Sequence, residues 1–194
     1  MPEPPPGADV LRAIRERRSV GRVGPDPLPR EAVAELLEAA VCAPNHHLTG
    51  PWRFIVLAGA ARAEVGAAHA RAVARRRPDA TPEALARESA RLERAPVVIV
   101  CAVGPAQDAV GAREDRDAVA AGVQNLLLAA HARGLAAMWR TGTMADEPEV
   151  REALALDASQ QIVGFVYLGR PLGPPAPRAA PRTRIDEVTV WRGW

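Results

Sequence analysis

The stretch AAGVQNLLLAAHA, residues 120–132, is small or apolar at every position except Gln124, Asn125 and His131. It forms the second half of a predicted helix over 113–133, and Gly134 is the residue type that commonly follows a helix C-terminus. A surface helix keeps a polar face, whereas a helix that is apolar nearly all round is buried. We therefore expect this helix at the centre of the fold.

Short apolar runs before and after this helix predict the strands of one small sheet, at residues 54–58, 97–101, 135–139 and 162–168. Two helices precede the first strand, one capped by Asp9 and one that begins at Pro29 and ends near Cys42. Further helices are predicted over 62–77, 81–94 and 149–156, and an alternating segment at 185–190 is a candidate edge strand. Because a Rossmann unit begins with a strand and a glycine-rich loop, the two leading helices argue against one.

The composition favours one domain and excludes some partners. At 194 residues, we expect a single domain over 1–194, with a flexible terminus at 1–8 and an extended tail at 170–194. A net charge of +2, with 23 acidic residues against 25 arginines and no lysine, is too small for a nucleic-acid binder. Alanine supplies much of the 48% hydrophobic share and buries little area, so a second subunit is expected to cover part of the apolar surface.

Cysteine usage and hydropathy predict a cytoplasmic protein. Cys42 and Cys101 lie far apart without metal or redox spacing, so reduced thiols are expected. The first residues are proline-rich and contain no apolar leader. The longest apolar run of a predicted strand, 97–103, is too short to cross a bilayer, so no membrane partner is expected.

The triplet Arg17-Arg18-Ser19 ends the first predicted helix and offers a compact set of donors to a phosphate. An arginine presents a bidentate fork, and a serine adds one hydroxyl. Adjacent arginines also arise by chance in a chain this rich in arginine, as in the run 75–77, which we interpret as a solvated helix face. A phosphate site at the triplet is supported only if other segments of the chain bind the same ligand.

Three later segments are candidates for the same anion-tailed ligand: the loop 43–47 (Ala-Pro-Asn-His-His), the strand end 139–142 (Trp-Arg-Thr-Gly) and the pair Arg182 and Arg184. Ligands are often met at strand ends, and glycine allows close approach of the backbone. The alternatives are a helix-ending turn, a strand-to-loop turn and surface charge, respectively. Zinc at His46 and His47 is disfavoured, because adjacent histidines rarely chelate one ion and no third ligand is evident, so no metal is expected.

In this order, the segments resemble the nitroreductase family of flavin mononucleotide (FMN) enzymes. The resemblance rests on Arg-Arg-Ser at 17–19, Ala-Pro at 43–44, Pro-Trp-Arg-Phe at 51–54, Gly-Leu-x-x-x-Trp at 134–139 and Gly-Phe-Val-Tyr-Leu-Gly-Arg-Pro at 164–171. It covers residues 9–190 and is greatest with the short, compact branch of the family. It implies an α+β fold of three layers, in which helices flank a small central mixed sheet and the C-terminal tail extends onto a partner subunit.

The resemblance also implies a homodimer with tightly bound FMN at the interface and NAD(P)H as co-substrate. Arg17 and Ser19 would hold the phosphate or the adjoining ribityl chain, and Arg18 would lie near the pyrimidine end. Arg182 and Arg184 would reach the phosphate from the tail. The remaining implied cofactor-binding residues are Pro44, Asn45 and His46 from the partner subunit, and Trp139, Arg140, Thr141 and Gly142 along the redox-active face or edge of the ring.

Three positions depart from the usual pattern of the family. Gly21 stands where many members carry a second basic residue, so Arg22 or the tail arginines are expected to complete the charge. Gly50 replaces a glutamine that many members place before Pro-Trp. Cys42 would lie near the flavin, and we expect its thiol only to pack there.

The implied activity is hydride transfer from NAD(P)H through flavin N5 to an electron-poor acceptor such as a nitroaromatic or a quinone, with ping-pong kinetics. The flavin carries the chemistry, so no catalytic side chain is assigned, although Arg140 is placed to polarise an acceptor. Two alternatives stay open: a dehydrogenase or dehalogenase type of FMN enzyme, and a flavin-binding or storage protein with little turnover. An arginine-rich nucleic-acid binder is disfavoured by the acidic residues and by an aromatic share of 4%.

Overall fold

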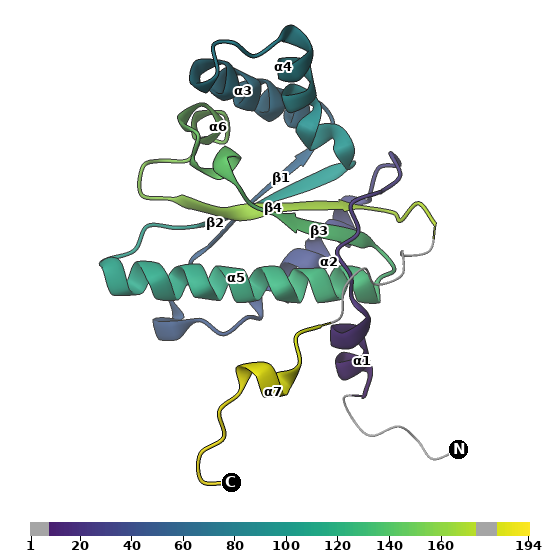
Figure 1. The fold of residues 1–194 in the computed structure, drawn as a ribbon, viewed down its shortest axis with the longest axis vertical. Helices are drawn as coiled ribbons and strands as arrows, with labels where there is room; N and C mark the ends of the chain where they lie inside the picture. Colours follow the sequence, from purple (N-terminus) through teal and green to yellow (C-terminus); the bar gives the residue numbers. More distant parts are fainter. Residues whose placement is uncertain (1–7, 174–181) are drawn as a thin grey trace.

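The computed structural model describes residues 8–173 and 182–194 (Figure 1). The flexible terminus and the proline-rich part of the tail that the sequence predicts fall mostly outside these residues. As predicted, two helices, α1 (Ala8–Glu16) and α2 (Arg30–Val41), precede the first strand. The predicted single helix over 81–94 is instead α4 (Pro82–Ser89) followed by the 3-10 helix η2 (Ala90–Arg94), and the Thr81 side chain caps α4 by accepting from the Ala84 N–H.

The sheet contains β1 (Trp52–Ala58), β2 (Val97–Val103), β3 (Ala136–Arg140) and β4 (Gln161–Gly169) in the order β1-β2-β4-β3. All three neighbouring pairs are antiparallel, so the expectation of a mixed sheet is wrong for the strands that the structure describes. The reason is topological. Ala58 pairs with Val97, so the helices between β1 and β2 return the chain to the end of the sheet that it left. β2 and β3 run in the same direction, but β4 lies between them.

Helices cover both faces of the sheet, which gives the three layers that the sequence predicts (Figure 1). Successive side chains of each strand point to opposite faces of the sheet, so the core has two halves. On one face, Ile99 and Cys101 pack with Val123 of α5 (Ala109–Ala132) and with Leu36 of α2. On the other face, Val98 and Val100 pack with residues of α3 (Ala60–Arg76), η2 and α6 (Pro148–Ala153).

The central helix is buried, as the sequence predicts, and it begins earlier than expected. Val119, Val123 and Leu126 are inaccessible to solvent. The helix starts at Ala109 because the Asp108 carboxylate accepts hydrogen bonds from the Val110 and Gly111 N–H groups. Of the helices in the described ranges, this one included, none has the length and apolar character that a membrane span requires.

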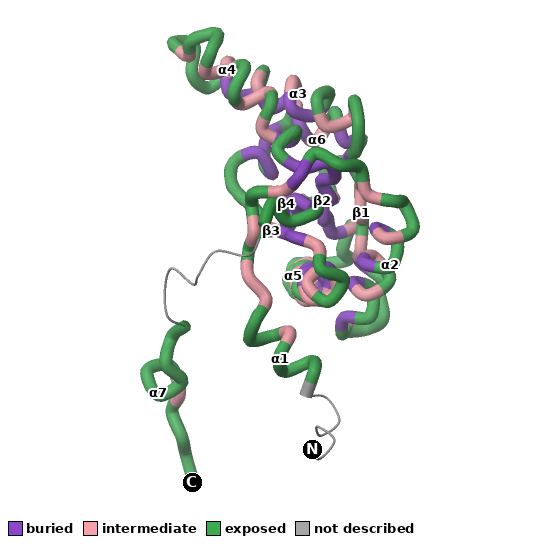
Figure 2. The backbone as a smooth tube through the Cα atoms, turned by 90° about the vertical axis from the view of Figure 1, so that its right-hand side faces the viewer, coloured by how far each residue is buried: buried purple, intermediate pink, exposed green. Residues whose placement is uncertain are grey.

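The segment 185–190 is not an edge strand. Ile185–Val188 form the short helix α7. At its start, the Glu187 N–H donates a hydrogen bond to the Arg184 carbonyl. A strand needs a neighbour with which to pair, and the described part of this chain provides none beside the tail. Figure 2 shows the tail as an exposed arm beyond the helices that surround the sheet.

Gly164 lies where the indole of Trp139 crosses β4, and this contact generates a test of the packing. A Cβ there would lie 2.1 Å from Trp139 Nε1 and 2.8 Å from the Arg140 carbonyl oxygen. We predict that Gly164→Ala lowers the free energy of unfolding by about 1–3 kcal/mol, measured by urea denaturation, because backbone and indole must shift. Gly104→Ala is the matched control, since its nearest neighbour would be 3.6 Å away. Equal stability of the two variants would contradict the packing described.

Candidate functional site

The loop after α1 lies along the edge strand β3. The Val20 N–H donates to the Ala137 carbonyl at 3.0 Å, which fixes the Arg17-Arg18-Ser19 triplet beside the sheet. Arg17 is half-buried, and its Nη1 atom is buried without a hydrogen-bond partner among the described residues. Burial, Arg182 and Arg18 together hold the pKa of Arg17 below its ordinary value. Ser19 is exposed.

Arg18 and Arg182 both donate to the last carbonyls of α1. Arg18 Nη1 donates to the Arg15 and Glu16 carbonyls at 2.8 and 2.7 Å, and Arg182 Nη2 donates to the Ile14 and Arg15 carbonyls at 3.1 Å. Cations are favourable at a helix C-terminus, because the carbonyls there carry partial negative charge. The fold therefore brings a tail arginine to the triplet from the other end of the sequence.

Arg184 is not part of this cluster. Its guanidinium forms a two-pronged pair with the Asp186 carboxylate, at 3.1 and 2.7 Å, and this pair raises the pKa of Arg184. Both side chains are exposed. In the described structure, Arg184 reinforces the first turn of α7, and the expected phosphate pair from the tail is reduced to Arg182.

The donor set at α1 fits a phosphate. Arg17, Arg18 and Arg182 bring three guanidinium groups together, and the charges that act on Arg17 are both positive. Like charges repel, and a buried N–H without a partner costs free energy, so the cluster is stabilised by an anion that accepts from Arg17 Nη1. A phosphate oxygen supplies the charge and the acceptor together.

The end of β3 meets this loop at Gly21. A Cβ at Gly21 would lie 3.0 Å from the Met138 side chain and 3.8 Å from Arg140 Nη2. The guanidinium beside the glycine departure therefore belongs to Arg140, whereas the sequence suggested Arg22 or the tail. Arg22 itself is exposed.

The residues that follow β3 border a polar cavity of about 150 Å³. The Arg140 guanidinium carbon lies 5.5 Å from the centre of the Tyr167 ring, within the range of a cation–π contact. Gly142, at φ 121°, adopts a backbone conformation that other residues rarely reach. Trp139 Nε1 is buried without a partner in the described part of the chain. The cavity is lined by Arg91, Arg140, Thr141, Met144, Phe165 and Tyr167.

The side-chain amide of Asn45 fixes the conformation of the loop between α2 and β1. Asn45 Oδ1 accepts from the Gly50 N–H at 2.8 Å, and Asn45 Nδ2 donates to Thr49 Oγ1 at 3.0 Å. Thr49 Oγ1 in turn donates to the buried Asp115 carboxylate on α5. Gly50 takes φ 62°, which explains a glycine there. The side chain of Asn45 thus shapes the loop, while His46 and Pro44 are exposed.

His46, His47 and Glu114 bring three possible ligand atoms within 4.8 Å of one another. His46 Nε2 and the Glu114 carboxylate are 4.0 Å apart, and both histidines are exposed. Glu114 is thus a third possible ligand that the sequence did not reveal, and two histidines with one glutamate match the three-ligand set of some catalytic zinc sites. Exposed groups of this kind are also common without an ion. The expectation of no metal stays a prediction.

This loop does not join the other segments within one chain. It contacts α5 at Asp115, whereas Arg18 lies beside His131, with which it lines an apolar hollow. From residue 115 to residue 131, α5 rises by about 24 Å. The loop also leads into β1, and β1 and β3 are opposite edges of the sheet. Pro44, Asn45 and His46 therefore lie far from the arginine cluster of their own chain.

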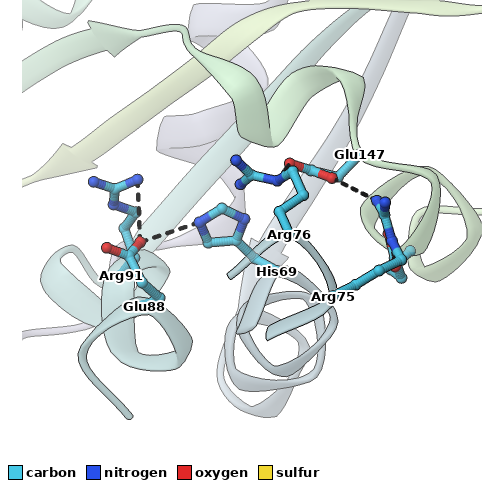
Figure 3. Close-up of polar contacts among 7 residues, drawn as sticks. His69, Arg75, Arg76, Glu88, Arg91 and Glu147 are labelled. Carbon is cyan, nitrogen blue, oxygen red and sulfur yellow. Dashed lines mark hydrogen bonds and ion pairs between the residues drawn. The ribbon is translucent and has the colours of Figure 1, made fainter. Parts of the chain in front are cut away.

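Sequence reasoning missed a charged cluster on α3 and α4 (Figure 3). His69 is buried, and its Nε2 lies 3.1 Å from Glu88 Oε2, the same oxygen that receives Arg91 Nη1 at 3.2 Å. Burial is the largest cause that holds the pKa of His69 below its ordinary value. No motif marks these residues, because Arg91 is one arginine among many and His69 lies in an alanine-rich helix.

A second buried acid ties α3 to the segment before α6. Glu147 receives Arg75 Nη2 at 3.1 Å and Arg76 Nε at 2.6 Å (Figure 3). Part of the run 75–77, expected to be only a solvated face, therefore pairs with a buried carboxylate. This contact joins α3 to the segment that leads into α6.

A family model and two relatives similar to this chain all carry nitroreductase names. The family model described as the Nitroreductase family matches residues 14–170. YfhC of Bacillus subtilis (strain 168), which carries an NAD(P)H nitroreductase name, is 30% identical over 180 residues, which are 92% of this chain and 92% of that protein. YdjA of Escherichia coli (strain K12), similarly named, is 32% identical over 166 residues, 84% of this chain and 88% of its own.

Two solved structures are similar over nearly the whole chain. A nitroreductase-like protein from Bacillus cereus superposes with a TM-score of 0.83 at 29% identity, covering 95% of this chain and 96% of that one. A structure from Desulfovibrio desulfuricans, described as a nitroreductase in complex with FMN, has a TM-score of 0.72 at 29% identity and covers 100% and 99%.

The buried His69 generates a prediction about pH. An unfolded chain protonates histidine near pH 6.5, whereas the fold resists that proton, so the free energy of unfolding falls as the pH decreases below about 6.5. We predict that wild-type protein loses more stability between pH 7.5 and 5 than His69→Gln does, by urea unfolding at each pH. The single site contributes a slope of at most about 1.4 kcal/mol per pH unit. The exposed His47→Gln serves as control, and identical pH dependence of wild type and His69→Gln would rule the effect out.

Proposed function

We propose that this chain, which belongs to the nitroreductase family, is a single FMN-binding domain and an oxidoreductase that uses NAD(P)H. The proposed acceptor is an electron-poor compound such as a nitroaromatic or a quinone, and the proposed kinetics are ping-pong. The observation that carries the proposal is the cluster of Arg17, Arg18 and Arg182, which has a buried N–H without a described partner and lies near the start of β3.

The proposed phosphate site is formed by the residues that follow α1. Arg17 presents its free Nη1 to a phosphate oxygen, and the exposed Ser19 hydroxyl supports the phosphate or the ribityl chain. Arg182 adds charge from the tail while it donates to the end of α1. Arg18, assigned at first to the pyrimidine end, also donates to α1 carbonyls, so its contribution to the site is mainly electrostatic.

The proposed ring site is at the end of β3. FMN held here would supply hydride transfer through its N5 atom, from NAD(P)H to the acceptor, and the protein would supply position and electrostatics. Trp139 is fixed against Gly164, and Gly142 gives the strand end a shape that lets the backbone of residues 141–142 approach a flat ring. A donor from this backbone near N5 favours the reduced state. Arg140, on the Tyr167 ring, brings positive charge to the same place.

We also propose that the functional unit is a homodimer. The loop with Pro44, Asn45 and His46 lies at the opposite sheet edge from the arginine cluster, so a second copy is needed to bring it to the flavin. Figure 2 shows α1 and the tail as largely exposed parts of the chain. Their exposed large apolar residues support an interface: Val10, Leu11, Ile14, Ile185, Val188, Val190, Trp191 and Trp194. The proposed location is the cytoplasm.

The function is tested on the purified protein after incubation with FMN. We expect a yellow protein whose visible band bleaches within seconds when NADPH or NADH is added without oxygen, and returns when a nitroaromatic follows. A protein that takes up no FMN would overturn the proposal. A yellow protein that does not bleach would indicate flavin storage instead.

Arg17 is the residue most directly tied to the phosphate. We predict that Arg17→Ala weakens FMN binding at least tenfold, measured by fluorescence titration of FMN, because a charge-assisted hydrogen bond contributes about 1.5–3 kcal/mol. Arg12→Ala is the control: it removes an exposed arginine of the adjacent helix α1, which among the described residues pairs with Asp9 alone. Equal FMN affinity of the two variants would place the phosphate elsewhere.

A further inference from the structure

We propose that Arg91 and Arg140 form a binding site for a planar, delocalised anionic group in the cavity between η2 and the end of β3. This site rests on the proposed function, because Thr141 belongs both to the cavity and to the proposed ring site. Arg91 was not among the residues that the sequence indicated, and it comes from the α4–η2 segment that covers this part of the sheet.

The lining of the cavity carries positive charge and hydrogen-bond donors. Its volume of about 150 Å³ suits a carboxylate, a nitro group or one edge of a heterocycle, and is too small for a dinucleotide. Arginines enter it from two separate elements, and the described residues that line it include no carboxylate. Guanidinium groups match flat anions with two adjacent acceptor atoms. We call this the two-arginine site.

Tyr167 adds a donor to the two-arginine site. Its ring is buried in β4 and packs under Arg140, at 5.5 Å from ring centre to guanidinium carbon. Burial is the main cause that raises the pKa of Tyr167, so the phenol keeps its proton at neutral pH. A protonated phenol and the Thr141 hydroxyl both donate to an anion.

Arg91 is positioned by the partly exposed Glu88, which the buried His69 contacts in turn. Glu88 Oε2 receives Arg91 Nη1 at 3.2 Å and lies 3.1 Å from Nε2 of His69 (Figure 3). His69 is buried and resists protonation, so its Nε2–H donates to the carboxylate as a neutral group and brings no second cation. Glu88 therefore compensates Arg91 alone, and the charge of Arg140 is left for the occupant of the cavity.

A flat, delocalised anionic group can belong either to the cofactor or to the acceptor. The pyrimidine edge of reduced FMN carries negative charge that is spread over a nitrogen and a carbonyl oxygen, and an acceptor with a carboxylate presents two equivalent oxygens. Both are flat, delocalised anions of the kind that paired guanidinium groups bind. The experiment must therefore separate the cofactor from the acceptor.

The test compares Arg91→Gln with Arg94→Gln in the FMN-loaded protein. Arg94 lies in the same 3-10 helix, is exposed and does not line the cavity. Its charge also acts on Tyr167, so this control separates direct contact with the occupant from the general effect of a nearby positive charge. Two quantities are measured: the midpoint potential of the flavin, and the ratio of kcat/KM for 4-nitrobenzoate to kcat/KM for its methyl ester. Thermal unfolding confirms that both variants are folded.

If the flavin is the source, Arg91→Gln binds reduced FMN about tenfold less well relative to oxidised FMN, which lowers the midpoint potential by about 30 mV, and the ratio is unchanged. If the acceptor is the source, the ratio falls about tenfold at an unchanged potential. Arg91→Gln values equal to those of Arg94→Gln in both measurements would overturn the two-arginine site, even with the proposed function intact.

Failure of the proposed function gives a different pattern. In that case, wild-type protein takes up no FMN or shows no reduction. The two-arginine site is then tested by titration calorimetry with benzoate, which must bind wild type at least tenfold more tightly than Arg91→Gln. Equal or absent binding in that titration would overturn the site as well.

Discussion

Close packing of α5 against α2 and the sheet is the constraint on which the rest of the structure depends. At Gly122, a Cβ would lie 2.9 Å from the Ala40 carbonyl oxygen and 3.1 Å from Trp52 Nε1, so only glycine allows this approach. One end of α5 holds the loop before β1 through Asp115, and the other end leads into β3 beside α1. A rigid buried helix thereby fixes the two groups of candidate ligands at opposite ends and opposite sheet edges. The same helix explains why one chain forms only half of the proposed site.

Clustered positive charge is the second constraint on the proposed site. Arg17, Arg18 and Arg182 collect around the end of α1, where backbone carbonyls satisfy two of the guanidinium groups and leave an N–H of Arg17 buried without a described partner. Arg140 and Arg91 repeat the arrangement around the cavity, with Glu88 compensating only Arg91. Arg17, Arg18 and Arg91 are half-buried whereas Arg140 and Arg182 are exposed, so the cost of leaving positive charge without an anion falls mainly on the half-buried members. A ligand with a phosphate at one end and a delocalised ring at the other matches both places.

The sequence predicted elements well where periodicity is strong, and predicted contacts poorly. The buried helix was recognisable because its residues 120–132 are nearly all small or apolar, but its true start depends on the Asp108 cap, which the periodicity does not show. The antiparallel sheet depends on which strands become neighbours, and this is decided by tertiary packing. Asn45 was assigned to a ligand by its chemistry, whereas its amide closes its own loop. Arg91 carried no local signal, since its importance comes from Glu88 and the cavity wall opposite.

We propose that the flavin site is divided between two copies of the chain. Sedimentation velocity of the FMN-loaded protein, recorded at 280 nm and at 450 nm, measures which species carries the flavin. We expect all bound flavin to sediment with a dimer, at two FMN per dimer, and dilution to monomer to release it. Flavin that sediments with a monomer would show that the site is not divided, because the described chain alone keeps the loop of His46 and the arginine cluster at opposite edges of its sheet.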